Sequence, residues 1–115
     1  MAEGSILRAD LLQGGWRNLS FAPFRQGITI HRLYGDGHGG PAGAILLYQP
    51  GASVPLHEHI GWEHVLVLEG EQTDERGRYP AGALLMNPPG SKHSVRSETG
   101  CAALLYWEKP VRIIG

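Results

Sequence analysis

Three histidines and one glutamate stand at spacings that suit a metal site. His57 and His59 are two residues apart, so on a strand both imidazoles leave the same face, while Glu58 between them points the other way. Glu63 follows a three-residue turn that can return its carboxylate to the two imidazoles, and His93 opens a later strand after a Pro-Pro-Gly turn. Three neutral imidazoles and a carboxylate that converge in a small barrel bind a divalent first-row metal. The sequence therefore predicts one divalent ion per chain, with zinc, iron, manganese and nickel left open.

The glycines and prolines predict the elements that hold these residues. Seventeen glycines and eight prolines fall between short apolar runs, a pattern typical of short strands joined by tight turns. About eight strands are expected, at 27–34, 44–49, 55–59, 63–69, 78–79, 83–86, 92–96 and 101–107, with a short strand start at 71–73 before a hairpin turn at 74–77. The fold class is therefore all-β, a barrel or sandwich of antiparallel strands.

Two turn and loop residues are candidates for the wall of a pocket. Residues 35–43 include five glycines and predict a flexible loop, in which His38 can act as a lid residue over the site. Trp62 lies in the turn between the candidate ligands and can line the mouth of a pocket, with packing as the equal alternative. No confident element is expected for residues 5–13.

A framework of glycine and proline surrounds the candidate ligands at fixed offsets. The first pattern is Gly51-x5-His57-x-His59-x3-Glu63-x6-Gly70, and the second, eleven residues later, is Gly82-x5-Pro88-x-Gly90-x2-His93. Both patterns resemble the two motifs of the cupin superfamily, except that the Asn closing the second motif is here Ser97. The resemblance implies a single small jelly-roll β-barrel of about eight or more strands, in which these three histidines and the glutamate bind one metal ion.

A narrower resemblance covers most of the chain. Residues 55–59, 63–70, 78–82, 87–91 and 93–101 are similar to the cupin domain of ChrR-type anti-sigma factors. The likeness implies one domain over 1–115, with an N-terminal arm at 1–14 and the barrel at 15–108. ChrR-type proteins hold the sigma factor with an N-terminal zinc domain that has His and paired Cys ligands. No His or Cys precedes Trp16 here, so we expect a free-standing cupin that binds no sigma factor.

Composition excludes several other classes of function. Ten Lys and Arg against eleven Asp and Glu give a net charge of −1, so there is no basic field for nucleic acid. No apolar run approaches the roughly 20 residues that cross a bilayer, and the first ten residues lack the apolar core of a signal peptide. A single cysteine, Cys101, forms no internal disulfide. We expect a cytoplasmic protein with no nucleic-acid or membrane partner.

Strand parity predicts an apolar outer wall. If Glu63 points inward, Val65 and Val67 do so as well, and Leu66 and Leu68 face outward; the strand at 101–107 is also apolar on both faces. A second sheet, the N-terminal arm or a second copy must cover such a wall. Because cupins commonly pair, we expect a homodimer.

Two functions follow from these features. The first is a small non-heme metal-dependent oxygenase, a dioxygenase in type, acting on a chelating oxygenated small molecule at the metal. The second is a non-catalytic metal-binding module with a sensory, regulatory or structural role. A four-ligand site leaves positions open in octahedral iron, manganese or nickel and none in tetrahedral zinc, so the ligand set does not decide between them. The sequence identifies no separate catalytic residue, and His64 and His31 are expected to lie outside the site.

Overall fold

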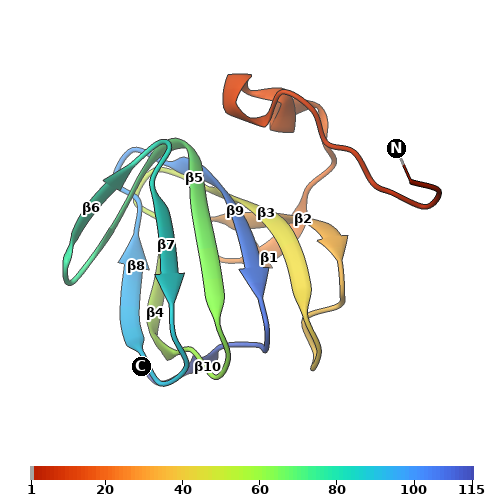
Figure 1. Ribbon diagram of the computed structural model, residues 1–115. Helices are drawn as coiled ribbons and strands as arrows, with labels where there is room; N and C mark the ends of the chain where they lie inside the picture. The colour runs from red at the N-terminus through yellow and green to blue at the C-terminus, as the bar shows by residue number, and fades with distance from the viewer. Residues whose placement is uncertain (1) are drawn as a thin grey trace.

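Antiparallel strands make up most of the chain in the computed structural model, which describes residues 2–115 (Figure 1). Two short 3-10 helices come first, η1 (Leu11–Gln13) and η2 (Gly15–Asn18). The strands are β1 (Ala22–Arg25), β2 (Ile28–Tyr34), β3 (Ala42–Tyr48), β4 (Ser53–Glu58), β5 (Glu63–Asp74), β6 (Gly77–Pro80), β7 (Leu84–Asn87), β8 (Lys92–Arg96), β9 (Cys101–Trp107) and β10 (Arg112–Ile113). The all-β antiparallel barrel that the sequence predicts is confirmed.

One long strand, β5, takes part in both walls of the barrel. Its first half pairs with β9 and β7, in a wall that continues through β3 and β2 to β1, and its second half pairs with β6 and β8, in a wall that continues to β4 and β10. Gly70 lies between the halves at φ +79°, and a Cβ there would overlap the carbonyl oxygen of Gly100. Glycine at this position therefore allows β5 to turn from one wall into the other.

The core lies between the two walls and follows the two-residue period of the strands. Alternate residues of β3 and β9 point inward and pack with residues of β2, β4, β5 and β8. The buried members are Ile28, Ile30, Ala44, Leu46, Tyr48, Val54, Val65, Val95, Cys101, Ala103 and Leu105. Both Val65 and Val67 are buried, as the strand parity predicts.

The end of the N-terminal arm, together with the residues that follow it up to Phe21, covers part of the apolar outer wall. The red segment in Figure 1, which includes both short 3-10 helices, lies outside the barrel. Leu11, Trp16, Leu19 and Phe21 pack on a second cluster that includes Ile45, Leu66, Leu68, Ala102 and Leu104. Arg17 pairs with Glu69 at 2.6 Å, and His31 is bonded to both Ser20 and Arg8. A second sheet, the N-terminal arm or a second copy was expected to cover this wall. In the structure the cover consists of Leu11 in the arm and of Trp16, Leu19 and Phe21, which follow the arm.

Four elements differ from the sequence-based expectation. β5 is one strand over residues 63–74, where two were expected, because Gly70 bends the strand without ending it. β1 and β10 were not predicted, since each is short and is defined by its partner strand. β3 begins at Ala42, so the last two residues of the segment 35–43, which was expected to be a loop, belong to this strand. Within residues 2–115, no helix has the length and apolar character needed to cross a membrane.

Ser97 and Glu71 fasten the turn before β9 to β5. The buried Ser97 hydroxyl donates to the backbone carbonyl of Glu71 at 2.6 Å, so the residue that departs from the second motif closes a structural hydrogen bond. The Glu71 carboxylate accepts hydrogen bonds from the Thr99 amide and hydroxyl, both at 3.0 Å, and from Thr73. The bond from the Thr99 amide is the largest cause that holds the pKa of Glu71 below its ordinary value of 4.5.

We predict that Glu71 contributes to stability in a pH-dependent way. Because the folded pKa is lowered, the contribution is complete above the ordinary pKa of 4.5 and is lost as the pH falls through the folded value. Glu71→Gln should lower the free energy of unfolding by about 1–3 kcal/mol at pH 7 and by less at pH 3.5. Urea unfolding with a chelator present measures both. Glu98→Gln, on an exposed side chain, is the control, and an equal loss at both pH values would contradict the prediction.

Candidate metal centre

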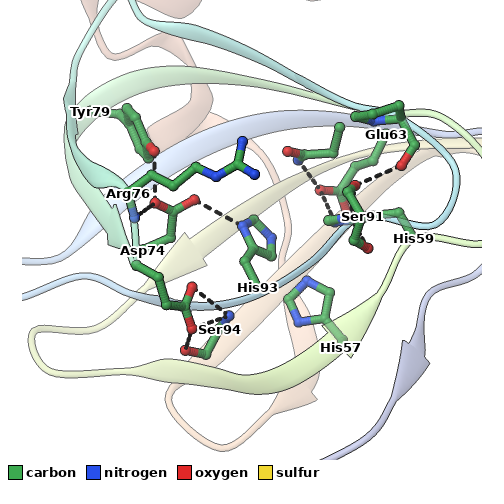
Figure 2. Close-up of polar contacts among 12 residues, drawn as sticks. His57, His59, Glu63, Asp74, Arg76, Tyr79, Ser91, His93 and Ser94 are labelled. Carbon is green, nitrogen blue, oxygen red and sulfur yellow. Dashed lines mark hydrogen bonds and ion pairs between the residues drawn. The ribbon is translucent and has the colours of Figure 1, made fainter.

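Three buried histidines meet between β4 and β8. His57 in β4 pairs across the sheet with His93 in β8, and His59 follows the end of β4. Their ring centroids lie 4.7 Å (His57–His93), 4.8 Å (His59–His93) and 5.1 Å (His57–His59) apart. One nitrogen of each ring lies within 4.8 Å of the other two. The structure thus brings together three of the four candidate ligands (Figure 2).

Each of these rings is held by a hydrogen bond at Nδ1. The acceptor for His57 is the carbonyl of Pro55, at 2.8 Å, and the acceptor for His93 is Oδ2 of Asp74, at 3.0 Å. His59 Nδ1 lies 3.1 Å from the carbonyl of Ser91 and 2.9 Å from its hydroxyl. Carbonyl and carboxylate oxygens carry no hydrogen, so Nδ1 is the protonated nitrogen in each ring. The lone pair is therefore on Nε2.

Two of the unprotonated Nε2 atoms in this cluster receive no hydrogen bond from the described residues. Nε2 of His59 and Nε2 of His93 are buried and accept no hydrogen bond from residues 2–115. Nε2 of His59 lies 3.2 Å from Oε1 of Glu63 without hydrogen-bond geometry, so an imidazole lone pair faces a carboxylate oxygen. Two electron-rich atoms at this distance are stabilised by a cation between the groups. The donor set therefore fits a divalent metal ion.

Glu63 stands at the start of β5 and is 5% exposed. Its Oε2 accepts a hydrogen bond from the Trp107 indole at 2.7 Å, and its Oε1 accepts one from the Asn87 amide at 3.0 Å. Burial pushes the pKa of Glu63 upward, and the hydrogen bond from Asn87 opposes this by stabilising the carboxylate. The carboxylate is therefore an oriented anion beside the histidines.

Asp74 orients His93 from the β5–β6 hairpin. Its second oxygen accepts hydrogen bonds from the Tyr79 hydroxyl at 2.7 Å and the Arg76 amide at 2.8 Å (Figure 2). Burial raises the pKa of Asp74, yet the bonds from Tyr79, His93 and Arg76 together lower it. A carboxylate on the far nitrogen of a ligating histidine fixes its tautomer and strengthens it as a ligand. From the sequence alone, Asp74 is expected only as part of a hairpin turn.

A cavity of about 280 Å³ opens beside the cluster. His57, Glu63 and His93 are part of its wall. Most of the remaining wall is apolar and includes Leu46, Val65, Leu85, Val95 and Leu105. Tyr48 and Gln72 add polar groups. The volume suits a small organic molecule, with one polar side formed by the candidate ligands.

The two candidate pocket residues occupy different places. His38, in the glycine-rich loop, lines the cavity beside Gly37 and Gly40. Trp62 is 44% exposed and is not among the described residues that line the cavity; its ring lies against His64, 6.4 Å between centroids. The backbone amide of Trp62 donates to Glu108 at 2.9 Å, which turns this segment outward.

His64 and Cys101 are not among the described residues that line the cavity. The His64 ring also lies 5.5 Å from the Tyr106 ring between centroids, and it alternates with the inward-facing Glu63 and Val65, so His64 lies on the outer surface. Cys101 is buried, and burial raises the pKa of its thiol to about 11. A thiol with this pKa is unreactive at neutral pH.

Comparison with known families gives one match over most of the chain. Residues 14–109 match the model of the ChrR Cupin-like domain. Over 77 residues, 64% of the chain, the sequence is 39% identical to the anti-sigma-E factor ChrR of Cereibacter sphaeroides. The match covers 36% of ChrR, so the chain spans about a third of the length of that relative.

Solved structures of two kinds share the fold. ChrR in the crystal structure of Rhodobacter sphaeroides SigE with the anti-sigma ChrR matches 78% of this chain and 49% of the other, with a TM-score of 0.68 and 26% identity. The acetylacetone dioxygenase of Acinetobacter johnsonii matches 100% of this chain and 80% of the other, with a TM-score of 0.78. At 19% identity, the second likeness shows the fold alone.

We predict that the purified protein retains about one divalent ion per chain and that His59→Ala or His93→Ala loses most of it. The physical reason is that each substitution removes one Nε2 lone pair from the cluster.

Asp74→Asn should weaken metal affinity by about 10–100-fold, because it removes the carboxylate that orients His93. Elemental analysis and competition with a chelator measure these effects.

His64→Ala is the matched control, since its ring lies on the outer surface and should leave metal content unchanged. Stoichiometric metal in a triple alanine variant of His57, His59 and His93 would rule out this centre.

Proposed function

This chain belongs to the family of ChrR cupin-like domains, and from its histidine cluster we propose that it is a divalent-metal-binding, small non-heme oxygenase. The proposed substrate is an oxygenated organic molecule that chelates the metal. The observation that carries the proposal is the position of His57, Glu63 and His93 in the wall of a cavity. An ion with a purely structural role needs no such space beside it, whereas a substrate does.

The proposed ligands are Nε2 of His57, His59 and His93 and the carboxylate of Glu63. The bound ion, zinc, iron, manganese or nickel, supplies Lewis acidity and a template for the oxygen donors of a substrate. Glu63 contributes a negative charge that the Trp107 and Asn87 bonds hold in place. The Nδ1 bonds set the direction of each imidazole before any ligand arrives.

Other residues of the cavity wall suit a small organic substrate. The apolar side chains exclude water from the region beside the ligands, which strengthens polar contacts there. Tyr48 lines the cavity, and its hydroxyl makes no hydrogen bond among residues 2–115. Burial raises the pKa of Tyr48, so the phenol stays protonated and can donate a hydrogen bond to a substrate oxygen.

A non-catalytic metal-binding module is the second candidate function. The 39% identity to an anti-sigma factor favours a sensory, regulatory or structural role for the ion. Under this hypothesis the metal shell is closed and the cavity holds no reacting molecule. Absence of sigma-factor binding stays a prediction from the sequence.

An exchangeable position on the metal separates the two functions. We predict that iron(II)-loaded protein binds nitric oxide and gives the electron paramagnetic resonance signal of a ferrous nitrosyl. Acetylacetone should perturb that signal, because a chelating molecule competes for the same positions. Glu63→Gln should keep the fold and slow oxygen consumption, since it removes the anionic ligand.

A closed shell would contradict the oxygenase. In that case iron(II) protein with full metal content gives no nitrosyl signal and binds no small ligand. The module would then replace the enzyme as the proposed function.

The outer wall also supports the homodimer that the sequence predicts. Leu84 and Met86 on β7 are 55% and 58% exposed, and Trp62 nearby is 44% exposed. His64 in β5 pairs with both Met86 and Tyr106, so these side chains lie on adjacent strands. Their exposure shows that Leu84 and Met86 remain largely accessible beside the part of the wall that Leu11, Trp16, Leu19 and Phe21 cover. We propose that a second copy covers it.

Light scattering at micromolar concentration should therefore give about twice the chain mass. Met86→Glu should shift the protein toward monomer, because it places a charge in the apolar patch. Ile114→Glu, near the strand β4 of the opposite wall, is the control and should leave the mass unchanged. A monomeric parent protein would contradict the dimer.

A further inference from the structure

Two arginines line the same cavity as the candidate metal ligands. Arg25 ends β1 and Arg32 lies in β2, the strand that pairs with β1. Both line the cavity together with His57 and His93, and neither belongs to the ligand set. The cavity is thus bounded by a histidine cluster and by two permanent positive charges.

One aromatic ring holds both guanidinium groups. The Cζ atom of Arg25 lies 5.3 Å from the centroid of the Phe24 ring, and the Cζ atom of Arg32 lies 5.9 Å from it. Phe24 itself lines the cavity, so both cations are placed at the cavity wall. A cation–π contact positions a guanidinium and leaves its N–H donors free for a ligand.

These donors have no anionic partner within residues 2–115. Four other arginines of the chain pair with glutamates, at Arg17–Glu69, Arg78–Glu71, Arg96–Glu98 and Arg112–Glu58. Arg25 and Arg32 form no such pair and donate no side-chain hydrogen bond. Asp36 also lines the cavity, and its carboxylate is close enough to Arg32 to interact with that charge, but it forms no ion pair with Arg32 and accepts a hydrogen bond from the His38 amide at 2.9 Å.

The wall beside the two cations is apolar. Val65, Leu85 and Leu105 line the same cavity and present hydrocarbon to a ligand. A molecule that fills this space therefore has oxygen donors for the metal, a short hydrocarbon spacer and an anionic end. Guanidinium groups match the planar geometry of a carboxylate.

We propose that Arg25 and Arg32 form a carboxylate subsite, so that the ligand of the metal centre is a small organic acid with chelating oxygens. This inference rests on the proposed function, because the oxygen donors are directed to the metal. The carboxylate is held by charge-assisted hydrogen bonds from the two guanidinium groups. The subsite thereby selects acids over neutral molecules with the same chelating group.

Calorimetry on nickel(II)-loaded protein, whose octahedral ion keeps positions open beside four protein ligands, tests the subsite without turnover. Three probes are compared: acetylacetone, succinylacetone, which adds a carboxylate on a short chain, and the methyl ester of succinylacetone. Succinylacetone should bind about tenfold tighter than its ester, because hydrogen bonds to charged groups are the stronger ones. The preference should shrink as salt is raised. In the Arg25→Gln/Arg32→Gln double variant, acid and ester should bind within about twofold of each other.

Arg96→Gln is the matched control, because it removes one positive charge from an exposed pair outside this cavity and should keep the preference. Circular dichroism and nickel content check each variant, and the single substitutions replace the double variant if it does not fold. Equal binding of acid and ester by the parent protein would overturn the subsite and leave the proposed function intact. Failure of all three probes to bind nickel(II)-loaded protein would overturn the proposed function and this inference with it.

Discussion

The hydrogen bond at Nδ1 of each clustered histidine is the contact on which the site depends. It places the proton on one nitrogen and leaves the other as a buried lone pair. A buried polar atom without a partner costs about 1–3 kcal/mol, and the cluster carries two, of which Nε2 of His59 lies 3.2 Å from a carboxylate oxygen. The unpartnered nitrogens stay buried because the two sheets enclose the cluster. A bound metal ion would remove this energetic cost, because it would accept the lone pairs.

The barrel supplies each of these contacts from a different segment. β4 and β8 pair so that His57 faces His93, and the turn before β8 provides Ser91 for His59. The far half of β5 returns Asp74 to His93, and the bend at Gly70 makes that return possible. The site is therefore a property of the two-sheet arrangement as a whole, and the cavity beside it is the space that the apolar core leaves open.

Local periodicity and the motif framework were enough to predict the histidine cluster. The contacts that depend on pairing between distant strands could not be predicted from the sequence. The spacing of His57 and His59 predicts that their side chains leave on the same side, which holds although β4 ends at Glu58, and the motif framework adds His93. Asp74 lies 19 residues from His93 in the chain, and nothing in the sequence around it points to that bond. Trp107 and Asn87 contact Glu63 for the same reason, through the register of β5 with β9 and β7. Trp62 is 44% exposed and is not among the described residues that line the cavity, an outcome that turn chemistry alone does not show.

The tautomers of the three histidines test the account most directly. Long-range proton–nitrogen NMR correlation on metal-free, nitrogen-labelled protein distinguishes a protonated Nδ1 from a protonated Nε2 in each ring. The account predicts that His57, His59 and His93 all carry the proton on Nδ1 at neutral pH, and that zinc shifts their Nε2 resonances while His64 is unaffected. Protonation of Nε2 in these rings, or Nε2 resonances that do not respond to zinc, would contradict it.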